Sequence, residues 1–123
     1  KNNALPITKQ LLRYLTWSQQ HVDPRLNGLL LNWYDGELDH YIGAHRDSTT
    51  GLLSDSPIVT ISLGEERVFR FRPYQKKGFQ DFIVREGDVV VVPAITNQHW
   101  THEVPKFKRY RQRRISVTLR AYE

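Results

Sequence analysis

The sequence predicts a mainly β protein: a jelly roll with one N-terminal helix packed on it. Two patterns lead to this prediction. Apolar residues at helical spacing occur in residues 6–21, and short runs typical of strands follow from residue 29 onward. One helix followed by about eight short strands is typical of an antiparallel β-sandwich or jelly roll. The chain shows neither internal repeats nor a low-complexity linker, so we expect a single domain over residues 1–123.

The helix is predicted from PITKQLLRYLTWSQQH, residues 6–21. Its apolar positions recur at the spacing of one helix face: Ile7, Leu11, Leu12, Leu15 and Trp17. Pro6 suits a first turn, Thr8 is a candidate N-cap, and His21 is placed to cap the C-terminal end. This amphipathic pattern predicts a helix that lies on a sheet.

The strands are predicted from runs rich in β-branched and aromatic residues, separated by turns and polar loops. DGELD (35–39) and the loop STTGLLSDSP (48–57) are the clearest breaks. Everything after the helix is predicted to be strands and turns. The predicted strands are residues 29–34, 40–47, 58–64, 68–73, 79–84, 88–93, 99–104 and 113–122.

The composition excludes several classes of protein. With 39% hydrophobic and 25% charged residues, the chain has the composition of a globular domain. It has no cysteine, which excludes disulfides, zinc-finger thiolates and thiol nucleophiles, and no apolar run long enough to cross a membrane. We expect a soluble intracellular monomer, cytoplasmic or nuclear. Because methionine is absent even at position 1, we also expect a piece of a longer chain.

The charge balance is basic, with 18 Lys and Arg against 13 Asp and Glu. The basic residues gather in KFKRYRQRR (106–114), interleaved with Phe107 and Tyr110. Such a segment can bind phosphates, for example through Lys108 and Arg109, while its rings stack on bases. The alternative is a solvated hairpin tip or loop without a ligand.

The segment YIGAHRD (41–47) places His45 and Asp47 two apart on a predicted strand, where such side chains share a face. An imidazole and a carboxylate aimed at one point are two thirds of a facial iron site, which needs a second histidine. His99 and His102 both lie in one predicted strand but face opposite ways, so only one of them can join the pair. The alternative is a surface pair joined by a hydrogen bond.

The last predicted strand has one apolar and one polar face. The polar face carries Arg114, Ser116, Thr118 and Arg120. If this face is covered, its guanidinium groups need an anionic partner, and a small dicarboxylate in the mouth of a jelly roll would supply one. The alternative is an edge strand with its polar face in water. Asn32 and Tyr34 share a face of an earlier strand and offer an amide and a phenol to an oxygen-rich ligand.

Eight motifs follow one another over residues 32–120: N-x-Y, a DG turn, IG-x-H-x-D, PIVTISLG, an F-x-F pair, EGDVVV, HW-x-H-x-VP and R-x-S-x-T-x-R. Each is weak singly, but the ordered set closely resembles the AlkB-like group of iron(II)- and 2-oxoglutarate-dependent dioxygenases. The resemblance implies a double-stranded β-helix, another name for the jelly roll. It also implies that His45, Asp47 and His102 are the iron ligands, with His99 as a neighbour.

The resemblance implies a 2-oxoglutarate site as well. Arg114 would pair with the distal carboxylate, helped by Tyr34, and Arg120 and Asn32 would lie near the metal-proximal end. Ser116 stands where the family usually has Asn, and it keeps one hydrogen-bond donor. The full set implied to contact 2-oxoglutarate is Asn32, Tyr34, Arg114, Ser116, Thr118 and Arg120.

The implied reaction uses Fe(II), 2-oxoglutarate and O2. It yields succinate and carbon dioxide and hydroxylates a nearby C–H bond. On an N-methyl base, the hydroxylated product loses formaldehyde, so the net reaction is demethylation. Methylated DNA or RNA is therefore the favoured substrate. The alternatives are an AlkB-like oxygenase that acts on a protein or a small molecule, and a non-catalytic nucleic-acid-binding module.

Some sequence features argue against a nucleic-acid substrate and others favour one. Repair members of the family often carry an acidic residue at the position of Thr49, and they build a substrate lid from the segment before N-x-Y, which here is mostly one helix. Basic residues favour nucleic acid, among them Arg67 and the pair Arg70 and Arg72, although these two also fit the solvent face of an amphipathic strand. The candidate substrate contacts are Arg46, Thr49, Arg70, Arg72, Lys108 and Arg109.

Overall fold

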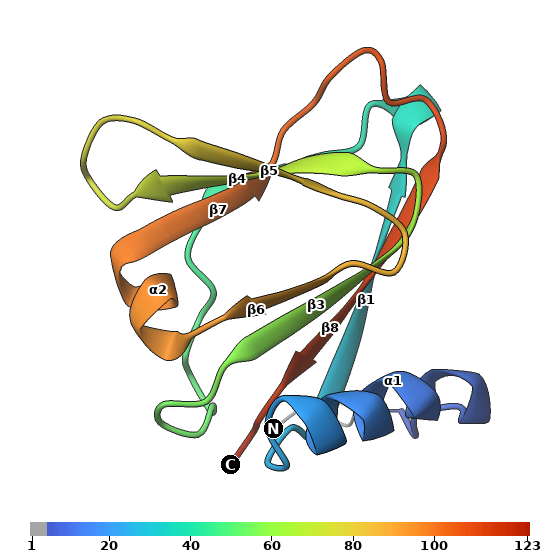
Figure 1. Ribbon diagram of the computed structural model, residues 1–123, viewed down its shortest axis with the longest axis vertical. Helices are drawn as coiled ribbons and strands as arrows, with labels where there is room; N and C mark the ends of the chain where they lie inside the picture. The colour runs from blue at the N-terminus through green and yellow to red at the C-terminus, as the bar shows by residue number, and fades with distance from the viewer. Residues whose placement is uncertain (1–4) are drawn as a thin grey trace.

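Two four-stranded antiparallel sheets face each other, with a helix on the outside of one of them, in a computed structural model that describes residues 5–123 (Figure 1). The mainly β, jelly-roll prediction is confirmed. The elements are α1 (Lys9–His21), β1 (Gly28–Asp35), the 3-10 helix η1 (Gly36–Leu38), β2 (Ile42–His45), β3 (Ile58–Gly64), β4 (Arg67–Pro73), β5 (Gln80–Val84), β6 (Val89–Val92), α2 (Ala94–His99), β7 (Trp100–Val104) and β8 (Arg113–Arg120).

The strand order is β1-β8-β3-β6 in one sheet and β2-β7-β4-β5 in the other. Strand β8 pairs with β1 on one side and with β3 on the other, both antiparallel. The alternative in which β8 is an edge strand with its polar face in water is therefore wrong. Since β8 lies inside its sheet, one of its faces points toward the opposite sheet and the other toward α1.

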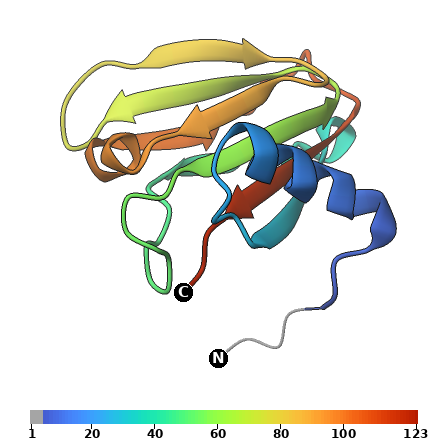
Figure 2. The ribbon, with the colours of Figure 1, turned by 60° about the horizontal axis from the view of Figure 1, so that its bottom comes forward.

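Helix α1 lies against the outer face of the β1-β8-β3-β6 sheet (Figure 2). It begins at Lys9, three residues later than predicted, and Thr8 occupies the N-cap position without a side-chain capping bond. His21 does cap the other end, because its Nδ1 donates to the carbonyl of Trp17 over 2.9 Å. Leu15 packs into the core, whereas Leu12 and Trp17, which the helical pattern placed on the same face, are 46% and 41% exposed.

The main apolar core lies beneath α1 and takes the apolar face of β8. Val117 and Leu119 are fully buried there against Leu15 and Val59. Burying each such side chain contributes about 1.5–3 kcal/mol to folding. Because this face of β8 supplies the core, its opposite face can carry polar groups into the space between the sheets.

Helix α2 was missed in the sequence, which predicted only strands and turns in this part of the chain. It is six residues long and follows Pro93, too short for a helical period to be detected. His99 is its last residue, so it does not lie on a strand. Within residues 5–123, we find no helix long and apolar enough to cross a membrane.

Candidate metal centre and co-substrate pocket

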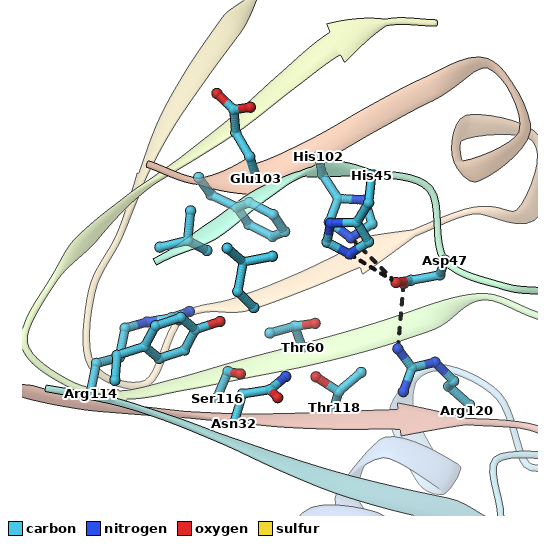
Figure 3. A pocket seen from close by; sticks show the side chains of 14 residues that line it. Asn32, His45, Asp47, Thr60, His102, Glu103, Arg114, Ser116, Thr118 and Arg120 are labelled. Atoms are coloured by element: carbon cyan, nitrogen blue, oxygen red, sulfur yellow. Dashed lines mark ion pairs between the residues drawn. The ribbon is translucent and has the colours of Figure 1, made fainter. Parts of the chain in front are cut away.

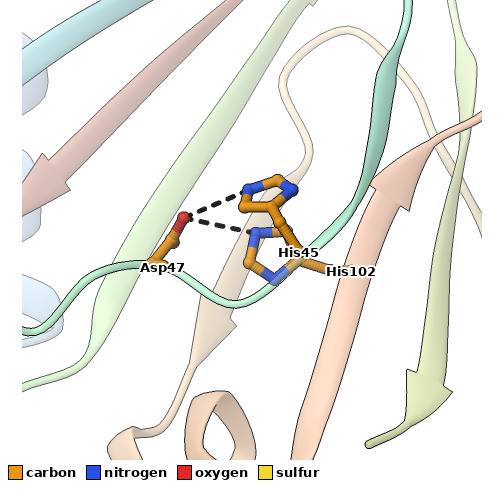
Figure 4. A group of neighbouring side chains, drawn as sticks. All are labelled: His45, Asp47 and His102. Atoms are coloured by element: carbon orange, nitrogen blue, oxygen red, sulfur yellow. Dashed lines mark ion pairs between the residues drawn. The ribbon is translucent and has the colours of Figure 1, made fainter.

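His45, Asp47 and His102 converge on one point between the two sheets (Figure 4). Nε2 of His45 lies 3.3 Å from Oδ1 of Asp47, and Nε2 of His102 lies 3.6 Å from the same oxygen. One potential ligand atom of each residue lies within 4.8 Å of the other two. Two imidazoles and one carboxylate so arranged match a 2-His-1-carboxylate facial site for a divalent metal such as Fe(II).

Strand pairing brings the two histidines together. His45, the last residue of β2, pairs directly with His102 of β7. Asp47 lies beyond the end of β2, so the prediction that it shares a strand face with His45 is wrong in detail. The loop nevertheless turns its carboxylate back toward both rings. His99 lies on α2 and takes no part in this cluster of described residues.

The orientation of the His45 ring is held by the backbone. Its Nδ1 lies 2.8 Å from the carbonyl oxygen of Gly43, and since a carbonyl only accepts, Nδ1 carries the proton. Nε2 is then free to act as a metal ligand. Nδ1 of His102 is buried without a partner among the described residues, and the ring packs edge-on against Phe69.

Asn97 of α2 positions Asp47, and the sequence analysis missed this residue. Oδ1 of Asn97 accepts from the backbone N–H of Asp47 over 2.9 Å, and its Nδ2 donates to the carbonyl of Asp47 over 3.1 Å. The Asn97 side chain is buried. An asparagine five residues before His102, just ahead of the HW-x-H-x-VP motif, was the only available signal, and its burial depends on a helix that was not predicted.

The charges around Asp47 favour its ionised form. Burial opposes ionisation of this carboxyl, but the neighbouring imidazole of His102, together with Arg120 and His45, outweighs it and lowers the pKa to about 2. Oδ2 of Asp47 lies 3.5 Å from Nη2 of Arg120. Asp47 is therefore a carboxylate at any working pH, as a metal ligand must be.

A pocket extends from these residues along the polar face of β8 (Figure 3). Strand pairing places β1 residues beside it, with Asn32 opposite Ser116 and Tyr34 opposite Arg114. The pocket thus has the metal cluster at one end and the Arg114 guanidinium at the other (Figure 3). All six residues expected to contact 2-oxoglutarate line it: Asn32, Tyr34, Arg114, Ser116, Thr118 and Arg120.

The buried guanidinium of Arg114 lacks a carboxylate partner. It is 2% exposed, and its Nη2 donates to Oγ of Ser62 over 2.8 Å. Its Nε and Nη1 have no partner among the described residues, and the ring of Tyr34 lies 5.0 Å away. Burial lowers the pKa of Arg114 and so works against its charge. Two unused N–H donors on a buried cation fit the carboxylate of a small anionic ligand.

The comparisons with known proteins agree with this geometry. The profile of the 2OG-Fe(II) oxygenase superfamily matches residues 2–120. The chain belongs to this superfamily. The "DNA oxidative demethylase ALKBH2" of Mus musculus is 35% identical over 102 residues, which cover 76% of this chain and 42% of the relative. The "Alpha-ketoglutarate-dependent dioxygenase alkB homolog 3" of Rattus norvegicus is 29% identical over 111 residues, or 83% of this chain and 37% of the relative.

A plant relative extends the comparison. The "DNA oxidative demethylase ALKBH2" of Arabidopsis thaliana is 27% identical over 119 residues, covering 78% of this chain and 38% of that protein. The resemblance to the AlkB-like group is confirmed. The chain spans about two fifths of the length of these curated relatives.

Arg67 is a second residue whose position in the structure the sequence did not predict. It was expected among nucleic-acid contacts, but it is 2% exposed and cannot reach a phosphate. Its Nη2 donates to the carbonyls of His40 and Pro105, each over 3.1 Å. The guanidinium lies 5.7 Å from the ring of Tyr34 and 5.3 Å from that of Tyr110. Arg67 therefore joins two loops behind the Arg114 end of the pocket.

Arg70 and Arg72 share the outer face of β4, as predicted, but they do not present free charge to a groove. Arg70 forms a bidentate salt bridge with Asp81, with Nε and Nη2 donating over 2.7 and 2.9 Å, and its Nη1 lies 3.7 Å from Oε1 of Glu103. Arg72 donates to the same glutamate over 3.3 Å. The carboxylates of Asp81 and Glu103 therefore neutralise the two arginines. The expectation of a positively charged groove on this strand is wrong.

The basic segment 106–114 lies largely in the loop before β8, at the Arg114 end of the pocket. Tyr110 is 4% exposed, so its predicted stacking on bases is wrong. Arg109 donates to its hydroxyl over 2.9 Å, and both Lys108 and Arg109 are exposed. At about 3.3 Å per residue, the length of β8 puts this loop roughly 20 Å from the metal end. Lys108 and Arg109 are therefore remote from a base held at the metal.

Arg46 and Thr49 lie nearer the metal, in a second pocket beside Asp47. The guanidinium of Arg46 stacks 3.7 Å from the ring centre of Tyr74, and its Nη1 donates to the carbonyl of Gln98 over 3.2 Å. Of the expected substrate contacts, these two lie next to the candidate metal centre.

Proposed function

We propose that this chain is the oxygenase domain of an Fe(II)- and 2-oxoglutarate-dependent dioxygenase that demethylates N-methylated bases in nucleic acid. The observation that supports it most is one pocket with a 2-His-1-carboxylate cluster at one end and, at the other, a buried arginine without a carboxylate partner among the described residues. Membership of the superfamily supports the cofactor requirement, and the printed names of the relatives support the substrate.

His45, Asp47 and His102 would hold the iron. Three protein ligands leave open positions for a chelating 2-oxoacid and dioxygen. Bound there, the metal supplies the oxidising chemistry that couples decarboxylation of 2-oxoglutarate to C–H hydroxylation. The protein keeps the ligands in place, through Gly43 on His45 and Asn97 on Asp47.

Arg114 would bind the distal carboxylate of 2-oxoglutarate. Its Nε and Nη1 have no partner among the described residues and can each donate to a carboxylate oxygen, and burial excludes water from the contact. The ring of Tyr34 lies beside this guanidinium. Arg120 and Asn32 line the pocket nearer the metal, where they would surround the other end of the co-substrate.

Demethylation follows if the hydroxylated carbon is an N-methyl group. Hydroxylation converts N–CH3 into N–CH2OH. The C–N bond then breaks, the nitrogen takes the hydroxyl proton, and formaldehyde leaves. The base is restored without further help from the protein.

The test measures succinate and formaldehyde with Fe(II) and 2-oxoglutarate, with and without a short N-methylated single-stranded oligonucleotide. We expect the oligonucleotide to stimulate both products and His102→Ala to abolish them, while His99→Ala on α2 retains activity. Succinate that no methylated oligonucleotide stimulates would remove nucleic acid as the substrate. Absence of succinate from a protein that binds iron would leave a non-catalytic binding module.

A second candidate is an oxygenase of the same type that acts on a protein or a small molecule. It is favoured by the position of α1, which packs on the outer face of its sheet. Within residues 5–27, the segment before β1 therefore does not cover the metal cluster. Formaldehyde or hydroxylated product from methylated peptides, but not from oligonucleotides, would support this candidate.

A further inference from the structure

Two buried arginines lie at the end of the co-substrate pocket that is remote from the metal ligands, one from each sheet. Arg114 belongs to β8, and Arg67 is the first residue of β4 in the opposite sheet. Arg67 shares the inner face of β4 with Phe69, which lines the pocket, whereas Arg70 and Arg72 lie on the outer face. Arg67 is not part of the pocket lining, so it lies just beyond the end of the pocket.

Both guanidinium groups lie over the ring of Tyr34. The ring centre is 5.0 Å from the guanidinium carbon of Arg114 and 5.7 Å from that of Arg67. Tyr34 belongs to β1, is 3% exposed and packs into the apolar cluster between the sheets. Since the face of an aromatic ring attracts cations, this one ring keeps the two positive charges at the same end of the pocket.

Neither of these cations is neutralised within residues 5–123. Each arginine is 2% exposed, and neither forms an ion pair with a carboxylate of the described chain. Arg114 donates to the hydroxyl of Ser62, and Arg67 donates to the carbonyls of His40 and Pro105. The Nε atoms of both arginines are buried without a partner among the described residues. This end of the pocket therefore carries two positive charges and no negative one.

The environment works against both charges in the free protein. Burial lowers the pKa of Arg67 and of Arg114, and the charge of Arg67 lowers the pKa of Arg114 further. The carboxylate of Glu65 acts on Arg67 in the opposite direction, but it accepts a hydrogen bond from the backbone N–H of Gln112 over 2.8 Å and forms no ion pair with the arginine. A carboxylate bound at this end of the pocket would relieve the repulsion between the two cations.

We propose that Arg67 is a positioning residue for the co-substrate: its charge supports that of Arg114 and makes the pocket selective for 2-oxoacids with a distal carboxylate. This inference rests on the proposed function and adds a residue to its 2-oxoglutarate site. Arg67 attracts the carboxylate without touching it, because charges inside a protein are screened less than charges in water. Its bonds to the carbonyls of His40 and Pro105 also hold two loops together behind Arg114.

The experiment compares two 2-oxoacids with the same five-carbon chain. 2-Oxoglutarate carries the distal carboxylate, whereas 2-oxopentanoate ends in a methyl group and offers the metal the same 2-oxoacid group. Binding to the Mn(II)-loaded protein is measured by isothermal titration calorimetry without oxygen, directly for 2-oxoglutarate and by competition for 2-oxopentanoate. In Arg67→Met we expect 2-oxoglutarate to bind about tenfold more weakly, because one partly screened charge is lost, and 2-oxopentanoate to bind as in the wild type.

Two further variants separate the charge of Arg67 from its structural contacts. Arg67→Lys keeps a positive charge at this position, and we expect it to bind 2-oxoglutarate within about threefold of the wild type. Arg111→Met removes a positive charge from an exposed position in the loop before β8 and is the matched control, with wild-type affinity. Thermal unfolding of each variant verifies that it is folded at the temperature of the titrations.

Succinate formation with Fe(II) gives a second measurement. We expect Arg67→Met to raise the KM for 2-oxoglutarate about tenfold and to leave kcat within about twofold of the wild type, since the metal ligands are unchanged. A variant damaged only in its structure would instead lose kcat, or would bind both 2-oxoacids equally more weakly.

Three results would overturn this inference and leave the proposed function intact: unchanged affinity of Arg67→Met for 2-oxoglutarate, an equal loss for the two 2-oxoacids, or an Arg67→Lys variant as weak as Arg67→Met. A wild-type protein that binds Mn(II) but not 2-oxoglutarate would overturn both the inference and the proposed function.

Discussion

The side-chain amide of Asn97 forms two hydrogen bonds with the backbone of Asp47: it accepts from the N–H over 2.9 Å and donates to the carbonyl over 3.1 Å. Fifty residues separate the two in the sequence. Asp47 lies outside any strand, so its backbone has no sheet partner to hold it. A side chain on the short helix α2 takes the place of that partner.

We therefore expect Asn97→Ala to weaken metal binding. Loss of the residues that orient a metal ligand typically lowers affinity about 10–100-fold, and we expect a value in this range. Mn(II) binding followed by isothermal titration calorimetry in the absence of oxygen measures it. Gln98→Ala, on an exposed position of the same helix, is the control and retains wild-type affinity. Equal affinities for the two variants would show that Asn97 does not position Asp47.

Arg114→Met separates co-substrate binding from folding. Two nitrogens of the buried guanidinium, Nε and Nη1, have no partner within residues 5–123, so its removal costs the free protein little stability. The wild type gains about 2.7 kcal/mol when 2-oxoglutarate is present at 100 times its Kd, and the variant gains none. Thermal unfolding of both proteins with and without 2-oxoglutarate and Mn(II) measures the difference. Arg113→Met, at the exposed neighbouring position, keeps the wild-type shift. A full shift in Arg114→Met would exclude Arg114 as the carboxylate partner.

Unlike Arg114→Met, the variant Arg67→Met is expected to lower the stability of the ligand-free protein. It leaves the carbonyls of His40 and Pro105 without their donor. Both bonds are partly buried, and a typical intramolecular hydrogen bond contributes about 0.5–1.5 kcal/mol, so we expect a loss of roughly 1–3 kcal/mol in the free energy of unfolding. Urea unfolding measures it, with the exposed Arg111→Met as control. A loss no greater than that of the control would show that the two loops hold together without Arg67.

The Arg70–Asp81 pair makes stability depend on pH. The hydrogen bond from Arg70 lowers the pKa of the Asp81 carboxyl. The pair therefore contributes fully above the unfolded-state pKa of about 3.9, and the contribution is lost as pH falls through the lower folded-state value. Both side chains are partly exposed, so we expect at most about 1 kcal/mol. Urea unfolding between neutral pH and pH 2 measures this. We expect the free energy of unfolding to decrease less on acidification in Asp81→Asn than in the wild type. Asp39→Asn, an exposed position, should follow the wild type.

Much of the fold was readable because its patterns are local. Strand alternation predicted β3 at its observed bounds, 58–64, and placed β8 within two residues. Helical spacing predicted α1, although its start and two of its apolar positions differ from the prediction. Helix α2 has less than two turns, and a pattern that short carries no usable period.

The sequence by itself determined the residue types at the candidate site and the two faces of β8, because side-chain alternation along a strand is a local property. Only the tertiary structure decided what those residues meet. Pairing of β2 with β7 set His45 opposite His102, and α2 placed Asn97 on Asp47. Packing also buried Arg67 and Tyr110, and it matched Arg70 with Asp81. These contacts join residues on different elements of the fold, so the pattern within any one segment does not contain them.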